Sequence, residues 1–208
     1  MNLFESFIKA VADWEMKTPQ FYGWFHLLWM GITLIVCTLI LIFRDKISPK
    51  AVDATLIVWG AVLIALEVLK QLILSFSYKD GQVVWDYAWW AFPFQFCSCP
   101  LYLALPAGIL RKGKIKTALQ SALASYALFA GIVVMIYPGN VFSSNAFLNV
   151  HSMFWHSSMV SVCSLLLATR TVDVSKLVSC EIKFQDVEKC VREHAENRNR
   201  FIKAVVKP

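Results

Sequence analysis

Five long apolar runs constrain the fold of this chain more than any other feature. Each is about 20 residues long, the length at which a helix crosses a bilayer. The chain is 58% hydrophobic, whereas soluble domains have about 45–50% apolar residues. The sequence therefore predicts an all-α, polytopic transmembrane helix bundle of about five spans. The runs cover residues 24–43, 52–76, 88–110, 117–137 and 147–169.

The distribution of Lys and Arg predicts the orientation of these spans. Basic residues crowd the loops after the first and third runs and the segment after the fifth, whereas the other two loops hold only Lys79. Cytoplasmic loops carry an excess of Lys and Arg, so we expect the N-terminus outside and the C-terminus inside. The net charge of +6 then reflects contact with membrane lipids, and no nucleic-acid partner is expected.

The flanking segments are predicted from their polarity. Residues 1–20 place apolar side chains at helical spacing and read as an interfacial amphipathic helix ended by Pro19. Residues 21–170 form the transmembrane domain, and residues 171–208 form a polar cytoplasmic tail that is compatible with a helix. No cleavable signal peptide and no disulfide framework are expected.

Polar side chains interrupt three of the runs at similar depths. Glu67, Cys97 and His156 each lie nine residues from the outer end of their run, which is ~13 Å at 1.5 Å per residue. A charge at mid-bilayer costs ~2.5–3.5 kcal/mol on insertion scales, so such residues usually face a bundle interior or a cavity. The sequence predicts one polar pocket in the outer half of the membrane domain.

Residues Glu67, Lys70 and Gln71 fall on one face of the second span. The simplest interpretation is an internal ion pair between Glu67 and Lys70 that stabilises helix packing, and a supporting role in the pocket is compatible with it.

The third run carries Cys97 between Pro93 and Pro100, and these prolines should break the helix. Broken backbone in a membrane is tolerated where it lines protein or a cavity. Cys97 and Cys99 point about 200° apart on a helix, so we interpret Cys99 as a small buried residue. For Cys97 the same reading and a reactive role remain open.

The fifth run carries His151 and His156, which point about 140° apart on a helix. They do not match the i, i+4 pair of a helical metal site, so no metal and no cofactor are expected. A histidine in a membrane helix often hydrogen-bonds to a neighbouring helix, but two in one outer-half segment also suggest function.

The stretch Phe92-Pro93-Phe94-Gln95-Phe96-Cys97-Ser98 resembles the Leu-Pro-x-His-x-Cys-Ser-like stretch of the YwaF-like family of bacterial integral membrane proteins. The pair Glu67-x-x-Lys70, the turn Tyr137-Pro138-Gly139 and the segment 151–156 are similar to the same family, and Gln95 stands where its pattern has His. The resemblance implies a multi-pass protein of the bacterial cytoplasmic membrane. It also implies a distant relation to animal acyltransferases that remodel ether phospholipids, with Cys97 and His156 in the catalytic roles.

Three functions remain open from the sequence. The first is a lipid acyltransferase or hydrolase-like enzyme, with Cys97 as nucleophile, His156 as base, and Gln95 or His151 as a hydrogen-bond donor. The second is a non-enzymatic protein that binds or transports a lipid or small molecule through the same pocket. The third is a structural membrane subunit whose polar residues only hold helices together.

Overall fold

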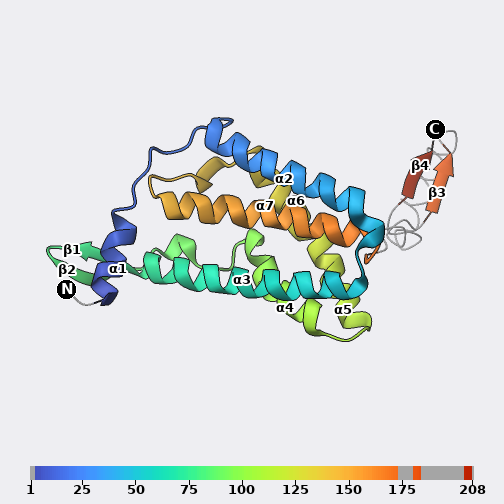
Figure 1. Cartoon of the computed structure of the whole chain (residues 1–208), viewed down its shortest axis with the longest axis horizontal. Coiled ribbons are helices and arrows are strands. Elements are labelled where there is room, and N and C mark those ends of the chain that lie inside the picture. Colours follow the sequence, from blue (N-terminus) through green and yellow to red (C-terminus); the bar gives the residue numbers. More distant parts are fainter. Residues whose placement is uncertain (1–2, 173–179, 184–203, 208) are drawn as a thin grey trace, which may run out of the picture. The chain divides into compact units, whose positions relative to one another are not determined.

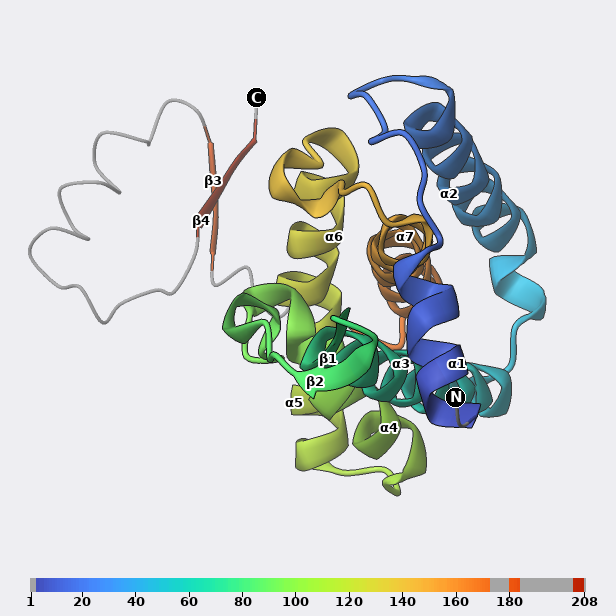
Figure 2. The same cartoon turned by 90° about the vertical axis from the view of Figure 1, so that its left-hand side faces the viewer.

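A computed structural model describes residues 3–172, 180–183 and 204–207. The chain divides into two compact units, residues 1–171 and 172–208. In the first unit, α2, α3, α6 and α7 run along one another, and α7 lies between α2 and α3 (Figure 1). Seen from the end, α7 occupies the centre of the bundle (Figure 2). The elements of this unit are α1 (Leu3–Ala12), α2 (Trp24–Phe43), η1 (Arg44–Lys46), α3 (Pro49–Ser75), β1 (Phe76–Lys79), β2 (Gln82–Trp85), η2 (Trp89–Ala91), η3 (Phe96–Ser98), α4 (Cys99–Ile109), α5 (Lys114–Ala122), η4 (Leu123–Ala127), α6 (Leu128–Ile136), η5 (Gly139–Val141) and α7 (Ala146–Ala168).

The predicted all-α membrane bundle is confirmed. Within the described residues, four helical segments are long and apolar enough to cross a membrane, and the helix from Phe96 to Ile109 is shorter but also apolar. The four are Trp24–Lys46, Pro49–Ser75, Lys114–Ile136 and Ala146–Ala168. Helix α7 is the most buried of them, as its central place requires.

Local sequence explains where two of these helices begin. Ser48 accepts a hydrogen bond from the backbone N–H of Ala51, and Pro49 occupies the first turn of α3. Asn145 caps α7 by accepting from the backbone N–H of Leu148. Both caps satisfy backbone donors that a helix start leaves without partners.

The third apolar run differs from a continuous span. Only its second half is helical, as α4, whereas residues 86–98 are extended backbone with two short 3₁₀ turns. The prolines explain the break, because Pro93 has no N–H and Pro100 suits only the first turn of a helix. The run still follows α3 for most of its length, from the Asp86 N–H···O=C Ser75 hydrogen bond to the contact between Gly108 and Asp53.

Helices α3 and α4 approach closely because glycine lies at their contact. A Cβ atom on Gly60 would lie 2.7 Å from the backbone nitrogen of Leu105. A Cβ atom on Gly108 would lie 2.9 Å from the carbonyl oxygen of Asp53. Small residues at membrane-helix interfaces allow such close packing, which fixes α4 against the first half of α3.

A β-hairpin follows α3 and directs the chain back along it. Strands β1 and β2 pair antiparallel around Asp80 and Gly81, both with positive φ, as a two-residue primed turn requires. Beside the hairpin, Lys79 donates a 2.6 Å hydrogen bond to Asp86. This hydrogen bond and the lysine charge hold the pKa of Asp86 below its usual range.

The predicted N-terminal helix is shorter than residues 1–20, because α1 ends at Ala12. Its apolar residues Leu3, Phe4 and Phe7 are exposed, and its interfacial position stays a prediction. After α1 the chain pairs with the segment that precedes α7, through Met16 N–H to Ser144 O and Ala146 N–H to Trp14 O.

The second unit holds a parallel pair of strands, β3 (Cys180–Lys183) and β4 (Ala204–Lys207). The tail was predicted to be compatible with a helix, and these eight residues are strands instead. Their β-branched residues Ile182, Val205 and Val206 favour that conformation. Apart from residues 171 and 172, the rest of the predicted tail lies outside the described residues.

Candidate functional site

The structure brings all six sequence-predicted site residues to the wall of one cavity of about 310 Å³. They come from α3, the unwound segment before α4, and α7. The chemical roles assigned to them stay predictions. The complete wall consists of Glu67, Lys70, Leu74, Trp90, Gln95, Cys97, Ser98, Val141, Ser143, Leu148, His151, Ser152, Trp155 and His156.

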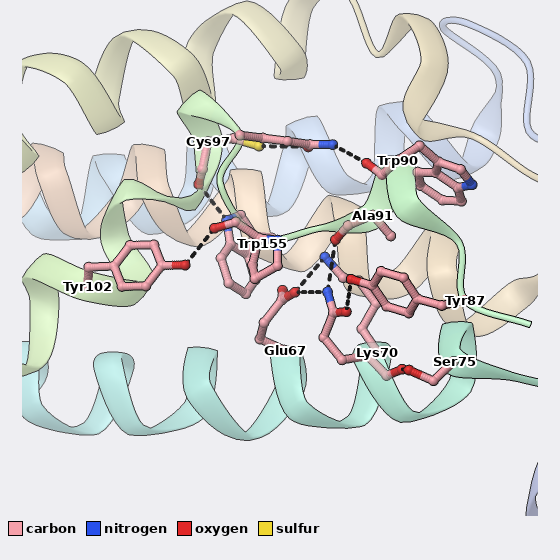
Figure 3. Close-up of polar contacts among 12 residues, drawn as sticks. Glu67, Lys70, Ser75, Tyr87, Trp90, Ala91, Cys97, Tyr102 and Trp155 are labelled. Carbon is pink, nitrogen blue, oxygen red and sulfur yellow. Dashed lines mark hydrogen bonds and ion pairs between the residues drawn. The ribbon is translucent and has the colours of Figure 1, made fainter. Parts of the chain in front are cut away.

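The unwound segment 90–98 is held by hydrogen bonds to its free carbonyl groups (Figure 3). A helix would satisfy these groups internally, and lipid offers no partner for them. Four side chains from within and around the segment do so instead. Gln95 donates to Trp90 O (2.8 Å), Gln71 to Ala91 O (2.8 Å), Tyr102 to Pro93 O (2.6 Å) and Trp155 to Cys97 O (2.9 Å).

The Cys97 thiol lies on this segment and is half-buried. Its sulfur donates to the side-chain oxygen of Gln95 over 3.6 Å. Figure 3 shows the resulting chain of contacts from Cys97 to the backbone of Trp90. Cys99 is not part of the cavity wall, in agreement with the expectation that the two cysteines face different sides.

The predicted ion pair between Glu67 and Lys70 is confirmed. The Lys70 ammonium lies 2.9 Å from the Glu67 carboxylate, which also accepts a 2.6 Å hydrogen bond from Gln71. The Tyr87 hydroxyl in turn donates to Gln71 over 2.7 Å. The network neutralises both charges and connects α3 to the start of the unwound segment.

His156 is oriented by its own helix. Its Nδ1 lies 2.8 Å from the carbonyl oxygen of Ser152. A carbonyl only accepts, so in neutral His156 the proton sits on Nδ1 and Nε2 carries a lone pair. Nε2 is buried and has no hydrogen-bond partner among the described residues. His156 therefore offers a free acceptor at the cavity.

His151 lies in the same wall and is 7% exposed. Its ring stacks on Trp155 at a centroid distance of 5.4 Å and also contacts Phe147. Its Nε2 is buried without a hydrogen-bond partner in the described part of the chain. A third buried histidine, His26, contrasts with both: Tyr22 N–H donates to its Nδ1, and its Nε2 contacts Met135 O at 2.9 Å. The two cavity histidines thus have hydrogen-bonding capacity that this structural histidine has already used.

The cavity has an exposed side and a buried side. Trp90 is 69% exposed and Gln95 is also exposed, whereas His156 is only 5% exposed. The neighbours of this rim along the chain, Phe94 and Phe96, are exposed apolar residues. The opening therefore lies at Trp90 and Gln95, and the histidines lie deeper.

Sequence reasoning missed several wall residues. Trp155 adjoins His156 in the chain, and this neighbour was a usable signal. Ser143 and Val141 come from the segment after the fourth run, where no sequence pattern indicates proximity to Cys97. No group of three or more His, Cys, Asp or Glu side chains within the described residues could hold a metal ion.

Comparison with protein families places this chain among known membrane proteins. No curated protein and no solved structure matches it in the corresponding comparisons. A family model does match, over residues 21–181, which is most of the 208-residue chain and includes every residue of the cavity wall. The chain is a multi-pass membrane protein and belongs to the TMEM164 family.

Proposed function

We propose that this protein transfers an acyl group from one membrane lipid to an acceptor hydroxyl, with Cys97 as the nucleophile and His156 as the base. The observation that carries the proposal is the unpartnered Nε2 of His156 in the same cavity as the Cys97 thiol. Activation of a cysteine nucleophile requires a base with a free lone pair that the thiol can reach, and this cavity wall holds both groups.

The first half of the reaction forms a thioester. Nε2 of His156 takes the thiol proton, and the sulfur attacks the ester carbonyl carbon of the donor lipid. The new S–C bond forms, the C–O bond to the donor breaks, and the proton passes from His156 to the departing oxygen.

The second half transfers the acyl group to the acceptor. The acceptor hydroxyl gives its proton to His156, and its oxygen attacks the thioester carbonyl. The C–S bond breaks, and the proton returns to the sulfur. Water in place of the acceptor would give hydrolysis, so access to water decides between the two outcomes.

The surroundings of the pair support lipid as the substrate. The exposed rim of the cavity carries Trp90 and adjoins Phe94 and Phe96, and in a membrane-spanning domain such a surface faces lipid. The negative charge that develops on the carbonyl oxygen needs donors, which His151 and Gln95 can supply from the wall. The pair Glu67–Lys70 orients this side of the cavity without adding net charge.

The membrane orientation is part of the proposal. The cavity lies towards the C-terminal end of α3, and the loops rich in Lys and Arg follow α2 and α4 at the other end of α3. By the distribution of these charges, the cavity opens in the outer half of the membrane.

A purely structural role for the polar residues has less support. A residue that only joins helices has its polar atoms hydrogen-bonded, as both ring nitrogens of His26 are. In contrast, His151 and His156 each keep a buried nitrogen without a partner in the described residues. Burying such a group costs ~1–3 kcal/mol, which a ligand in the cavity would recover.

Labelling with a thiol-reactive lipid analogue tests the proposal. The purified full chain should be labelled at Cys97, and Cys97→Ala should abolish the labelling. Cys99→Ala is the matched control, because this cysteine lies two residues away but outside the cavity wall, and it should label like the wild type. His156→Ala should slow labelling at Cys97. Equal labelling of the wild type and His156→Ala would overturn the assigned roles.

A further inference from the structure

We infer that Gln95 is a positioning residue that holds the Cys97 thiol in a resting orientation, away from His156. The inference rests on the proposed function, because it concerns how the same thiol becomes available to its base. It assigns a regulatory role to a residue at the mouth of the cavity.

Gln95 makes two contacts at the mouth of the cavity. Its side-chain oxygen accepts from the Cys97 sulfur at 3.6 Å, and its amide nitrogen donates to Trp90 O at 2.8 Å. The second contact fixes which end of the amide faces the thiol. The thiol is thereby directed along its own segment, towards the rim.

The Gln95 amide cannot activate the thiol that it contacts. An amide oxygen accepts a hydrogen bond but is too weak a base to remove a thiol proton near neutral pH. While the thiol donates to Gln95, Cys97 stays protonated and a poor nucleophile, because the thiolate is the reactive form.

The base, His156, is unused in this arrangement. His156 holds its proton on Nδ1 through Ser152 O, so its Nε2 is the only ring nitrogen that can accept the thiol proton. That nitrogen has no hydrogen-bond partner among the described residues. The structure thus contains a nucleophile engaged by an inert acceptor and a base with its lone pair unused, which is an inactive arrangement of both.

Gln95 is exposed at the opening of the cavity, whereas His156 lies buried below. The Gln95 side chain can turn outward by giving up its hydrogen bond to Trp90 O, and a molecule entering past Trp90 meets it first and can replace that bond. Rotation of the Cys97 side chain towards His156 then completes the active pair.

The test measures alkylation of Cys97 by N-ethylmaleimide in the purified full chain in lipid vesicles, with each cysteine followed by peptide mass spectrometry. Gln95→Ala should raise the Cys97 rate about threefold or more, as expected for loss of one neutral hydrogen bond to the thiol. Gln95→Met, which keeps the length of the side chain but lacks the amide, should do the same. Gln82→Ala, at an exposed glutamine in β2, should leave the rate unchanged.

The His156→Ala background separates this inference from the proposed function. The gain in rate should disappear in Gln95→Ala/His156→Ala. Likewise, Gln95→Ala should alter the pH dependence of the alkylation rate only when His156 is present. A wider opening alone would accelerate alkylation in both backgrounds and would overturn the inference. An unchanged rate in Gln95→Ala and Gln95→Met would also overturn it.

The proposed function fails by a different result. If His156→Ala leaves Cys97 alkylation unchanged with Gln95 intact and with Gln95 replaced, the thiol and the histidine do not interact at all. If His156→Ala slows the alkylation of Cys97 but Gln95→Ala does not accelerate it, then Cys97 and His156 interact and Gln95 does not restrain the thiol. Cys163, which is fully buried, should label slowly throughout and reports an intact bundle.

Discussion

Trp155 donates its indole N–H to the backbone carbonyl of Cys97 over 2.9 Å, and this bond joins the central helix α7 to the unwound segment (Figure 3). The same indole stacks on His151 and precedes His156 in the chain. One side chain therefore connects the segment that carries the thiol to the helix that carries both histidines. The geometry of the cavity depends on this contact.

Replacing Trp155 by Phe should destabilise the protein by about 1–3 kcal/mol, because the Cys97 carbonyl is left without its donor in a buried environment. Thermal unfolding in detergent measures this change. Trp24→Phe is the control, since Trp24 is 75% exposed at the start of α2, and it should leave the melting temperature nearly unchanged. Equal melting temperatures for Trp155→Phe and the wild type would show that the contact contributes nothing.

Glu67→Ala should destabilise the protein more than the double variant Glu67→Ala/Lys70→Ala. Removing only the carboxylate leaves the Lys70 charge uncompensated and also deprives Gln71 of an acceptor. In soluble cores such a break costs ~3–5 kcal/mol. Unfolding free energies of the two singles and the double variant measure the coupling. Additive losses would mean that the two residues act independently.

Gly60→Ala should loosen the contact between α3 and α4 at a cost of about 1–3 kcal/mol, because the added Cβ meets the backbone nitrogen of Leu105, which cannot turn away. Gly31→Ala tests the same substitution in α2, where a Cβ meets nothing within 4 Å. That control should be neutral or stabilising, since alanine favours helices. A comparison of unfolding midpoints measures both, and a stable Gly60→Ala would contradict the close packing.

Lys114→Cys should react with a membrane-impermeant thiol reagent only after the membrane is opened. Lys114 is exposed at the start of α5, in a basic loop that the charge distribution assigns to the inside. Ser77→Cys, in the hairpin at the opposite end of α3, should react from outside in intact cells. Labelling of Lys114→Cys in intact cells would show that the orientation is the opposite one and that the cavity lies in the inner half of the membrane.

The sequence by itself determined which segments are long and apolar enough to cross the membrane, and its predicted depths grouped polar residues that share one cavity wall. The predicted run 24–43 coincides with α2, and the run 147–169 differs from α7 by one residue at each end, because hydrophobic length follows directly from bilayer thickness. The prolines around Cys97 also predicted the break in the third run, since proline removes a backbone donor wherever it stands. Depth was sufficient to group Glu67, Cys97 and His156.

Only the tertiary structure decided which way these side chains face and what completes the wall around them. Rotation of a helix about its axis is set by the helices packed against it, and the apolar residues of a membrane span can face either lipid or a neighbouring helix. Val141 and Ser143 reach the cavity wall from a segment far along the chain from Cys97, and the Trp155–Cys97 hydrogen bond joins residues 58 positions apart. Such contacts arise when α7 packs against the unwound segment, and hydropathy along the chain carries no information about them.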